Sequence, residues 1–277
     1  MKKILKNLRV KEVLLMTGFF SIGVFFAASE FEQLWQMRTI IGLLSTSFLF
    51  LGIYSFNSLC GLKEDKDNPR LNFIYGKKFF LGFVIIFKVL SLLGFYWLGP
   101  MFFKLSIISM ILWIYYSWPG LGAKYIPIAS SLVHFVTQII HFLLGYLILQ
   151  QYSLLAVLIS IYFSLLFVAG HLNHEIIDYK ADKLKDIKTN AVYFGAQNAQ
   201  IASLFLFCLS FMYSLSIILF YPSTISFFLP FQLAFVIQGL IYFKKYRAHF
   251  DALKFRGSYR SLYFYAGLLA LLSKGLA

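Results

Sequence analysis

Charged residues and cysteines are scarce in this sequence of 277 residues. Only 13% of the residues are charged, and only 11 are acidic. The two cysteines, Cys60 and Cys208, have no partner at metal-ligand spacing and therefore indicate neither a disulfide framework nor a zinc site. Hydrophobic residues make up 60% of the chain, whereas about 45–50% is typical of a soluble domain even with glycine included. This composition excludes an ordinary water-soluble globular domain.

The hydrophobic residues form long runs without the alternation that marks a β-strand. In a bilayer the backbone must satisfy its own polar groups, which leaves helices or a closed barrel, and long unbroken runs favour helices. Since a span needs about 20 mostly apolar residues, we predict an all-α polytopic membrane bundle of about nine transmembrane helices, in a single domain over residues 1–277. The predicted spans are Val13–Ala28, Ile40–Leu62, Phe79–Leu98, Phe102–Ser117, Ile126–Leu149, Leu154–His171, Ile201–Phe220, Ile225–Phe243 and Leu262–Leu272.

The basic residues gather on alternate connections between these spans. Five precede the first span, five follow the second, and further groups follow the sixth and the eighth, whereas the other side has only Arg38, Lys104 and Lys274. By the positive-inside rule the basic side is cytoplasmic. We therefore predict a multi-pass protein of the cell inner membrane, with its N-terminus inside and its C-terminus outside. The net charge of +14 then reflects membrane orientation, and we expect no nucleic-acid partner.

Seven of the 11 acidic residues lie in two connections that are both on the predicted cytoplasmic side. Glu175, Asp178 and Asp182 are three and four residues apart, so a continuing helix places them on one face. Mg²⁺ is often held by one or two carboxylates together with substrate phosphate oxygens. The spacing is therefore compatible with a diphosphate bound through Mg²⁺, with nearby lysines balancing the remaining charge. The alternative is a solvated helix end whose acids offset neighbouring lysines.

Two stretches resemble the acidic motifs of the UbiA superfamily of membrane prenyltransferases. The segment HEIIDYKADKLKDIKTNAVYFG, residues 174–195, is similar to the second motif and keeps its acids, with Asp186 in place of a glycine. Residues 57–69 match the frame of the first motif, N-D-x-x-D-x-x-x-D-x-x-N-P, but Ser58 and Gly61 replace its first two aspartates. Residues 116–124, YSWPGLGAK, resemble a third segment that reads Y-S-x-P-P-x-x-x-K.

The resemblance implies a Mg²⁺-dependent enzyme that transfers a polyprenyl group from its diphosphate to an aromatic or other lipophilic acceptor within the membrane. Its partners would be a prenyl diphosphate, the acceptor and membrane lipid. The implied metal ligands are Asp65, Glu175, Asp178 and Asp182. The implied diphosphate-binding residues are Asn57, Arg70, Lys124, Lys180 and Lys188. The implied catalytic residues are Tyr116, Lys124, Asp178 and Asp182.

Two alternatives stay open, a terpene cyclase on the same scaffold and a degenerate member that binds isoprenoid without turning it over. Neither the acceptor nor the donor length can be read from the sequence. His134 and His141, seven residues apart on the fifth predicted span, lie on one helix face, and we expect them to point into the bundle.

Overall fold

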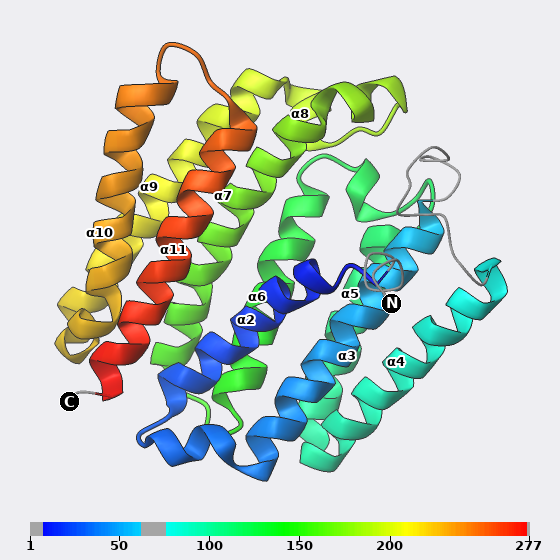
Figure 1. Ribbon diagram of the computed structural model, residues 1–277, viewed down its shortest axis with the longest axis vertical. Helices are drawn as coiled ribbons and strands as arrows, with labels where there is room; N and C mark the ends of the chain where they lie inside the picture. The colour runs from blue at the N-terminus through cyan, green and yellow to red at the C-terminus, as the bar shows by residue number, and fades with distance from the viewer. Residues whose placement is uncertain (1–7, 62–75, 276–277) are drawn as a thin grey trace. The chain divides into compact units, whose positions relative to one another are not determined.

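The computed structural model describes residues 8–61 and 76–275 (Figure 1), and the regular structure in this part of the chain is entirely helical. The prediction of an all-α fold is therefore confirmed. The chain divides into two compact units, Met1–Ala156 (unit 1) and Val157–Ala277 (unit 2), each of which is described by itself.

The described part of unit 1 contains five long helices. They are α2 (Val10–Ala27), α3 (Met37–Cys60), α4 (Gly76–Leu98), α5 (Pro100–Ser117) and α6 (Ala129–Tyr146). Helix α3 packs against α2, α4 and α5, and α6 packs against α2 and α5. Pro100 occupies the first turn of α5, where its missing N–H costs nothing. Because α4 runs back between them in the sequence, α3 and α5 end at the same end of unit 1 (Figure 1).

Two glycines allow α2 and α6 to approach closely. A Cβ on Gly145 would lie 2.8 Å from the carbonyl carbon of Phe20, and one on Gly23 would lie 2.9 Å from the backbone nitrogen of Tyr146. Small residues at such crossings let backbones meet, which is how helices commonly pack in lipid. Only glycine fits at both positions without a shift of one helix.

Unit 2 contains three further long helices after α7 (Leu154–Leu184), which begins just before the boundary between the units. They are α9 (Ala196–Phe220), α10 (Ile225–Ile241) and α11 (Ala252–Gly275), and the short helix α8 (Asn190–Phe194) precedes α9. Aromatic side chains that include Phe207, Phe255 and Tyr259 pack around Ala169 of α7. Asn173 of α7 also donates to Ser203 of α9 at 2.6 Å. Helices α7, α9 and α11 are thus joined along one side of α7.

Each of the nine predicted spans overlaps one long helix of the described residues, although the boundaries differ. Among the described residues, seven helices are long and apolar enough to cross a membrane, and Glu12–Ala27 is a shorter apolar helix. Helix α11 is not among these seven, and its first half carries Lys254, Arg256 and Arg260. The count of nine spans and the orientation of the termini stay predictions.

Helix α7 is much longer than its predicted span, which ended at His171. The residues from Leu172 to Leu184 include no proline or glycine, so nothing in the sequence ends the helix there. Its 31 residues correspond to about 46 Å, against a hydrocarbon thickness of about 30 Å. The helix is therefore long enough to carry its acidic C-terminal part past the apolar layer.

Candidate functional site

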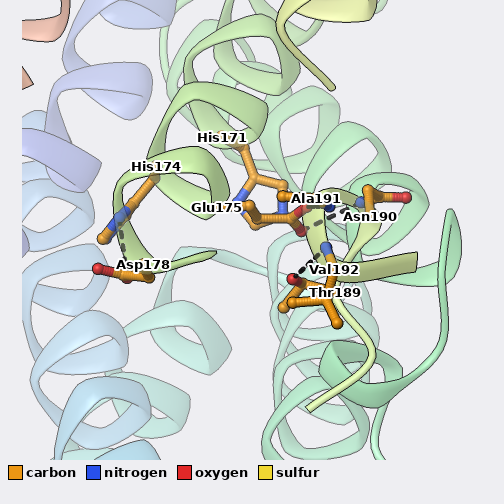
Figure 2. A network of polar contacts seen from close by, with 8 residues as sticks. All are labelled: His171, His174, Glu175, Asp178, Thr189, Asn190, Ala191 and Val192. Carbon is orange, nitrogen blue, oxygen red and sulfur yellow. Dashed lines mark hydrogen bonds and ion pairs between the residues drawn. The ribbon is translucent and has the colours of Figure 1, made fainter. Parts of the chain in front are cut away.

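The carboxylate of Glu175 is buried and lies at the centre of a hydrogen-bonded network in unit 2 (Figure 2). Its Oε1 accepts from Nδ2 of Asn190 at 3.0 Å, and its Oε2 accepts from the backbone N–H of Ala191 at 3.2 Å. Nε2 of His171, one turn earlier on α7, lies 3.0 Å from the same Oε1. The side chain of Glu175 is only 5% exposed. Glu175 therefore joins α7 to the start of α8.

The turn between α7 and α8 is fixed by its own backbone. Asp186 has a φ of +52°, in the left-handed region that glycine adopts freely and that Asp tolerates better than most residues. This conformation explains why a glycine is expected at that position in the family motif. Thr189 then begins α8, with its hydroxyl accepting from the backbone N–H of Val192 (Figure 2). Lys188 is exposed and lies in the chain between Asp186 and Thr189, whose backbone conformations are defined by these features.

Asp178 lies on α7 one turn after Glu175, and its environment is quite different. Its side chain is 50% exposed, and Nδ1 of His174 lies 3.1 Å from its Oδ2 (Figure 2). Asp182, four residues further on, is partly exposed, and Lys180 is exposed between the two acids. Asp178 and Asp182 therefore present two accessible carboxylates about one turn apart, next to positive charge.

The donor set near Asp178 fits a hard divalent cation only if the substrate contributes ligands. Within residues 8–61 and 76–275, no group of three or more His, Cys, Asp or Glu side chains could hold a metal ion alone. Two carboxylates suffice where phosphate oxygens and water complete an octahedral shell, which is the usual arrangement for Mg²⁺. The buried oxygens of Glu175 already accept hydrogen bonds from Asn190 and Ala191. Among the second-motif acids, Asp178 and Asp182 are thus the more accessible donors.

In unit 1 the structure shows what replaces the aspartates of the first motif. The hydroxyl of Ser58 is turned back to the carbonyl of Tyr54 at 2.9 Å, and Gly61 ends α3 with its N–H bonded to the carbonyl of Asn57. Asn57 itself is half-buried in the last turn of α3. Asp65 and Arg70, predicted to bind metal and diphosphate, lie outside the described residues.

Tyr116 and Lys124 are separated by a tight turn at the end of α5. The N–H of Gly122 donates to the carbonyl of Trp118 at 2.8 Å, and a Cβ on Gly122 would lie 2.6 to 2.7 Å from three carbonyl oxygens. Only glycine fits this turn. Nζ of Lys124 lies 4.7 Å from the ring centroid of Tyr125. The turn therefore sets the position of Lys124, whose predicted phosphate contact stays a prediction.

The predicted residues thus fall into two groups, each within one unit. Asn57, Tyr116 and Lys124 lie near one end of unit 1, and Glu175, Asp178, Lys180, Asp182 and Lys188 lie around the end of α7 in unit 2. Neither Asn190 nor His171 was among the site residues predicted from the sequence. The spacing of His171 and Glu175, four residues on one helix, was the available signal for their pairing.

Comparison with known proteins finds a match to the UbiA prenyltransferase family over residues 14–268. A search of curated protein sequences finds no match.

Among solved structures, the chain is similar to a UbiA homologue from Archaeoglobus fulgidus bound to GPP and Mg²⁺, with a TM-score of 0.77 and 17% identity over 98% of this chain and 99% of that one. It is also similar to a digeranylgeranylglyceryl phosphate synthase, with a TM-score of 0.74 and 14% identity over the full length of both chains. A third similar structure is a UbiA homologue from Aeropyrum pernix K1, with a TM-score of 0.70 and 15% identity over 95% of this chain and 97% of that one. At these identities the likeness establishes the fold.

Proposed function

The chain belongs to the UbiA prenyltransferase family, and we propose that it catalyses Mg²⁺-dependent transfer of a polyprenyl group from its diphosphate to a lipophilic acceptor within the membrane. The observation that carries this proposal is the pair of accessible carboxylates, Asp178 and Asp182, at the end of α7 beside exposed Lys180 and Lys188. The homologues solved with GPP or DMAPP and Mg²⁺ support the same chemistry.

In the proposed reaction the bond between the first prenyl carbon and the diphosphate oxygen breaks, and that carbon forms a bond to the acceptor, which loses a proton. When bound, Mg²⁺ supplies positive charge that stabilises the departing diphosphate. Asp178 and Asp182 would hold the cation. Lys124, Lys180 and Lys188 would donate charge-assisted hydrogen bonds to the phosphate oxygens.

Asn57 and Tyr116 of unit 1 are two further residues for which the family resemblance implies a role. Asn57 would donate to a phosphate oxygen through its amide, and the ring of Tyr116 would face the positive charge that develops on the prenyl carbon. The apolar helices would keep water from that carbon. We further propose a location in the cell inner membrane with the N-terminus inside, since the basic connections gather on one side.

The test is release of diphosphate by the full-length protein in lipid nanodiscs, with geranylgeranyl diphosphate and a panel of lipophilic acceptors. We expect release that requires Mg²⁺, and Asp178→Asn should lower kcat by about a hundredfold or more, the range seen when one electrostatic contact to a developing charge is lost. Glu32→Gln is the matched control, because Glu32 is an exposed carboxylate that is not among the proposed site residues. Release that continues without Mg²⁺, or that Asp178→Asn leaves unchanged, contradicts the proposal.

Analysis of the products by mass spectrometry separates this function from the two alternatives. A cyclase is tested because Ser58 and Gly61 replace two aspartates of the first motif, and an altered motif can accompany a different reaction. A prenylated acceptor supports transfer, and a hydrocarbon formed without acceptor supports a cyclase. Binding of the isoprenoid with no turnover supports a degenerate family member.

A further inference from the structure

Unit 1 buries a row of polar side chains on one face of α6. His134, Gln138 and His141 are four and three residues apart, so they lie on the same face, and their exposures are 7%, 0% and 0%. The expectation that the two histidines point into the bundle is therefore confirmed. Polar and ionisable side chains inside a membrane bundle are costly and usually mark a functional site. Neither the proposed metal site nor the proposed diphosphate contacts use these three residues.

Helix α5 presents a matching row to this face. Oγ of Ser109 lies 2.8 Å from Nε2 of His141, and the ring of Trp113 meets that of His134 with centroids 4.9 Å apart. These two contacts fix an antiparallel register in which Gln138 lies between them. We call Ser109, Trp113, His134, Gln138 and His141 the buried polar row.

Two hydrogen-bond donors in the row are not used within the protein. Neither Nε2 of Gln138 nor Nε1 of Trp113 has a hydrogen-bond partner within residues 8–61 and 76–275, although Gln138 is 0% and Trp113 only 4% exposed. The other end of the Gln138 amide, Oε1, faces Nδ1 of His141 at 3.5 Å. Buried donors are nearly always paired. Two unpaired donors on facing helices therefore indicate a ligand that accepts hydrogen bonds.

The chemistry of the row restricts this ligand. Amide and indole N–H groups donate only, so the ligand must carry oxygen lone pairs. The row contains no lysine, arginine or carboxylate, and a charged group buried without a counter-charge would be strongly disfavoured. The row also has an aromatic neighbour, since the ring centroid of Phe50 lies 4.6 Å from that of His141. These features favour a neutral, flat ring that bears hydroxyl or carbonyl oxygens.

The row also continues directly from a proposed catalytic residue. The ring of Tyr116 lies 4.9 Å from that of His134 and 5.4 Å from that of Trp113. From His134 to His141 the row extends for about 10 Å along α6, which is the length of a small fused ring system. A ring bound along the row would therefore have one edge beside Tyr116.

We propose that the buried polar row is the acceptor subsite and that the acceptor is a neutral ring compound bearing hydroxyl or carbonyl oxygens. This inference rests on the proposed function, because it names the acceptor class of that reaction. It excludes carboxylated rings and phosphorylated alcohols as the preferred acceptors. Gln138 and Trp113 would hold the ring by its oxygens, with one edge of the ring beside Tyr116.

The first experiment measures binding without turnover, using the full-length protein in nanodiscs with no Mg²⁺ and no prenyl donor. The probes are a dihydroxynaphthalene, the same ring bearing a carboxylate, and glycerol phosphate. We expect the neutral ring to bind best, and Gln138→Leu and Trp113→Phe each to weaken it by about tenfold, the effect of one ordinary hydrogen bond. Thr137→Val is the matched control, since Thr137 is equally buried but bonds the carbonyl of Val133 within α6.

Three results would overturn the inference: no binding of the neutral ring, tighter binding of either anionic probe, or unchanged affinity in both Gln138→Leu and Trp113→Phe. Because Trp113→Phe keeps the aromatic ring, it separates loss of the N–H from a general folding defect, which the thermal unfolding midpoint checks.

The second experiment is steady-state prenyl transfer with the neutral ring. Gln138→Leu should raise the KM for the acceptor and leave the KM for the prenyl diphosphate unchanged, whereas equal effects on both KM values would contradict the assignment. If the wild-type protein binds the ring but releases no diphosphate with any acceptor, the proposed function fails while the subsite stands. If it releases diphosphate but does not bind the ring, the subsite fails while the function stands.

Discussion

Removing the hydrogen bond between Asn190 and Glu175 should loosen α8 from α7 without affecting the metal requirement of the enzyme. Asn190 and Ala191 donate to the buried Glu175 carboxylate at 3.0 and 3.2 Å, and Nε2 of His171 lies 3.0 Å from its Oε1. A hydrogen bond to a charged group contributes about 1.5–3 kcal/mol to stability, so we expect Asn190→Ala to cost about that much. Glu175→Ala leaves the buried donors of Asn190 and Ala191 without an acceptor, at about 1–3 kcal/mol each, or about 2–6 kcal/mol together.

A double-mutant cycle isolates the contact. The free energy of unfolding is measured in mixed micelles for wild type, Glu175→Ala, Asn190→Ala and the double variant. Since both single variants remove the same bond, their effects should fall short of additivity by about 1.5–3 kcal/mol. Asn198→Ala is the matched control, because the amide of Asn198 bonds the carbonyl of Phe194 instead, and its effect should add to that of Glu175→Ala.

The same variants distinguish a positioning role from metal binding. We expect the Mg²⁺ concentration for half-maximal activity to stay near the wild-type value in Glu175→Ala and Asn190→Ala, and to rise in Asp178→Asn. The reasoning is refuted if Glu175→Ala raises that concentration as much as Asp178→Asn does while its unfolding free energy adds to that of Asn190→Ala. Glu175 would then be a metal ligand, as the family resemblance alone implies.

Two further predictions concern the packing and the helix ends. Gly145→Ala should destabilise unit 1 by about 1–3 kcal/mol, typical of overpacking, because the new Cβ would meet the backbone of Phe20; Gly18→Ala, with open space around Gly18, should cost far less in the same unfolding assay. The backbone N–H of Lys254 donates to Asp251 and lowers the pKa of that carboxyl in the folded protein. The ionised carboxylate therefore stabilises the first turn of α11 fully at any pH above the pKa of Asp251 in the unfolded chain. This stabilisation is lost as the pH falls through the lower pKa of the folded protein. Hydrogen-exchange protection of that turn should decrease in acid in the wild type and be low at every pH in Asp251→Ala.

The helices could be predicted because lipid imposes a simple rule on sequence. A backbone in hydrocarbon must pair its own polar groups, so each long apolar run had to be a helix, and Ile225–Phe243 matches α10 to within two residues at its end. The predicted ends of the helices were less accurate where a helix continues beyond its apolar run. The helix α7 continues through charged residues as far as Leu184, because charged side chains at a polar interface do not break a helix.

The contacts of Glu175 could not be predicted, because they depend on a turn whose path is not encoded locally. Asn190 lies 15 residues away in the sequence. It reaches Glu175 only because Asp186 reverses the chain in a left-handed conformation and Thr189 begins α8. The buried polar row is a different case. The spacing of His134 and His141 revealed their shared face, but the partners on α5 follow from the antiparallel register, which the sequence leaves open.

Equal spacing on a helix did not give the three acids of the second motif equal surroundings. Glu175, Asp178 and Asp182 lie within one narrow arc of α7, yet the side chain of Glu175 is 5% exposed and that of Asp178 is 50% exposed. The difference arises because the start of α8 covers only the first of the three positions. A carboxylate that already accepts from a side-chain amide and a backbone N–H can bind a cation only by giving up those bonds. Glu175 therefore anchors the turn that carries Lys188, whereas the side chain of Asp178 is half exposed and that of Asp182 is partly exposed.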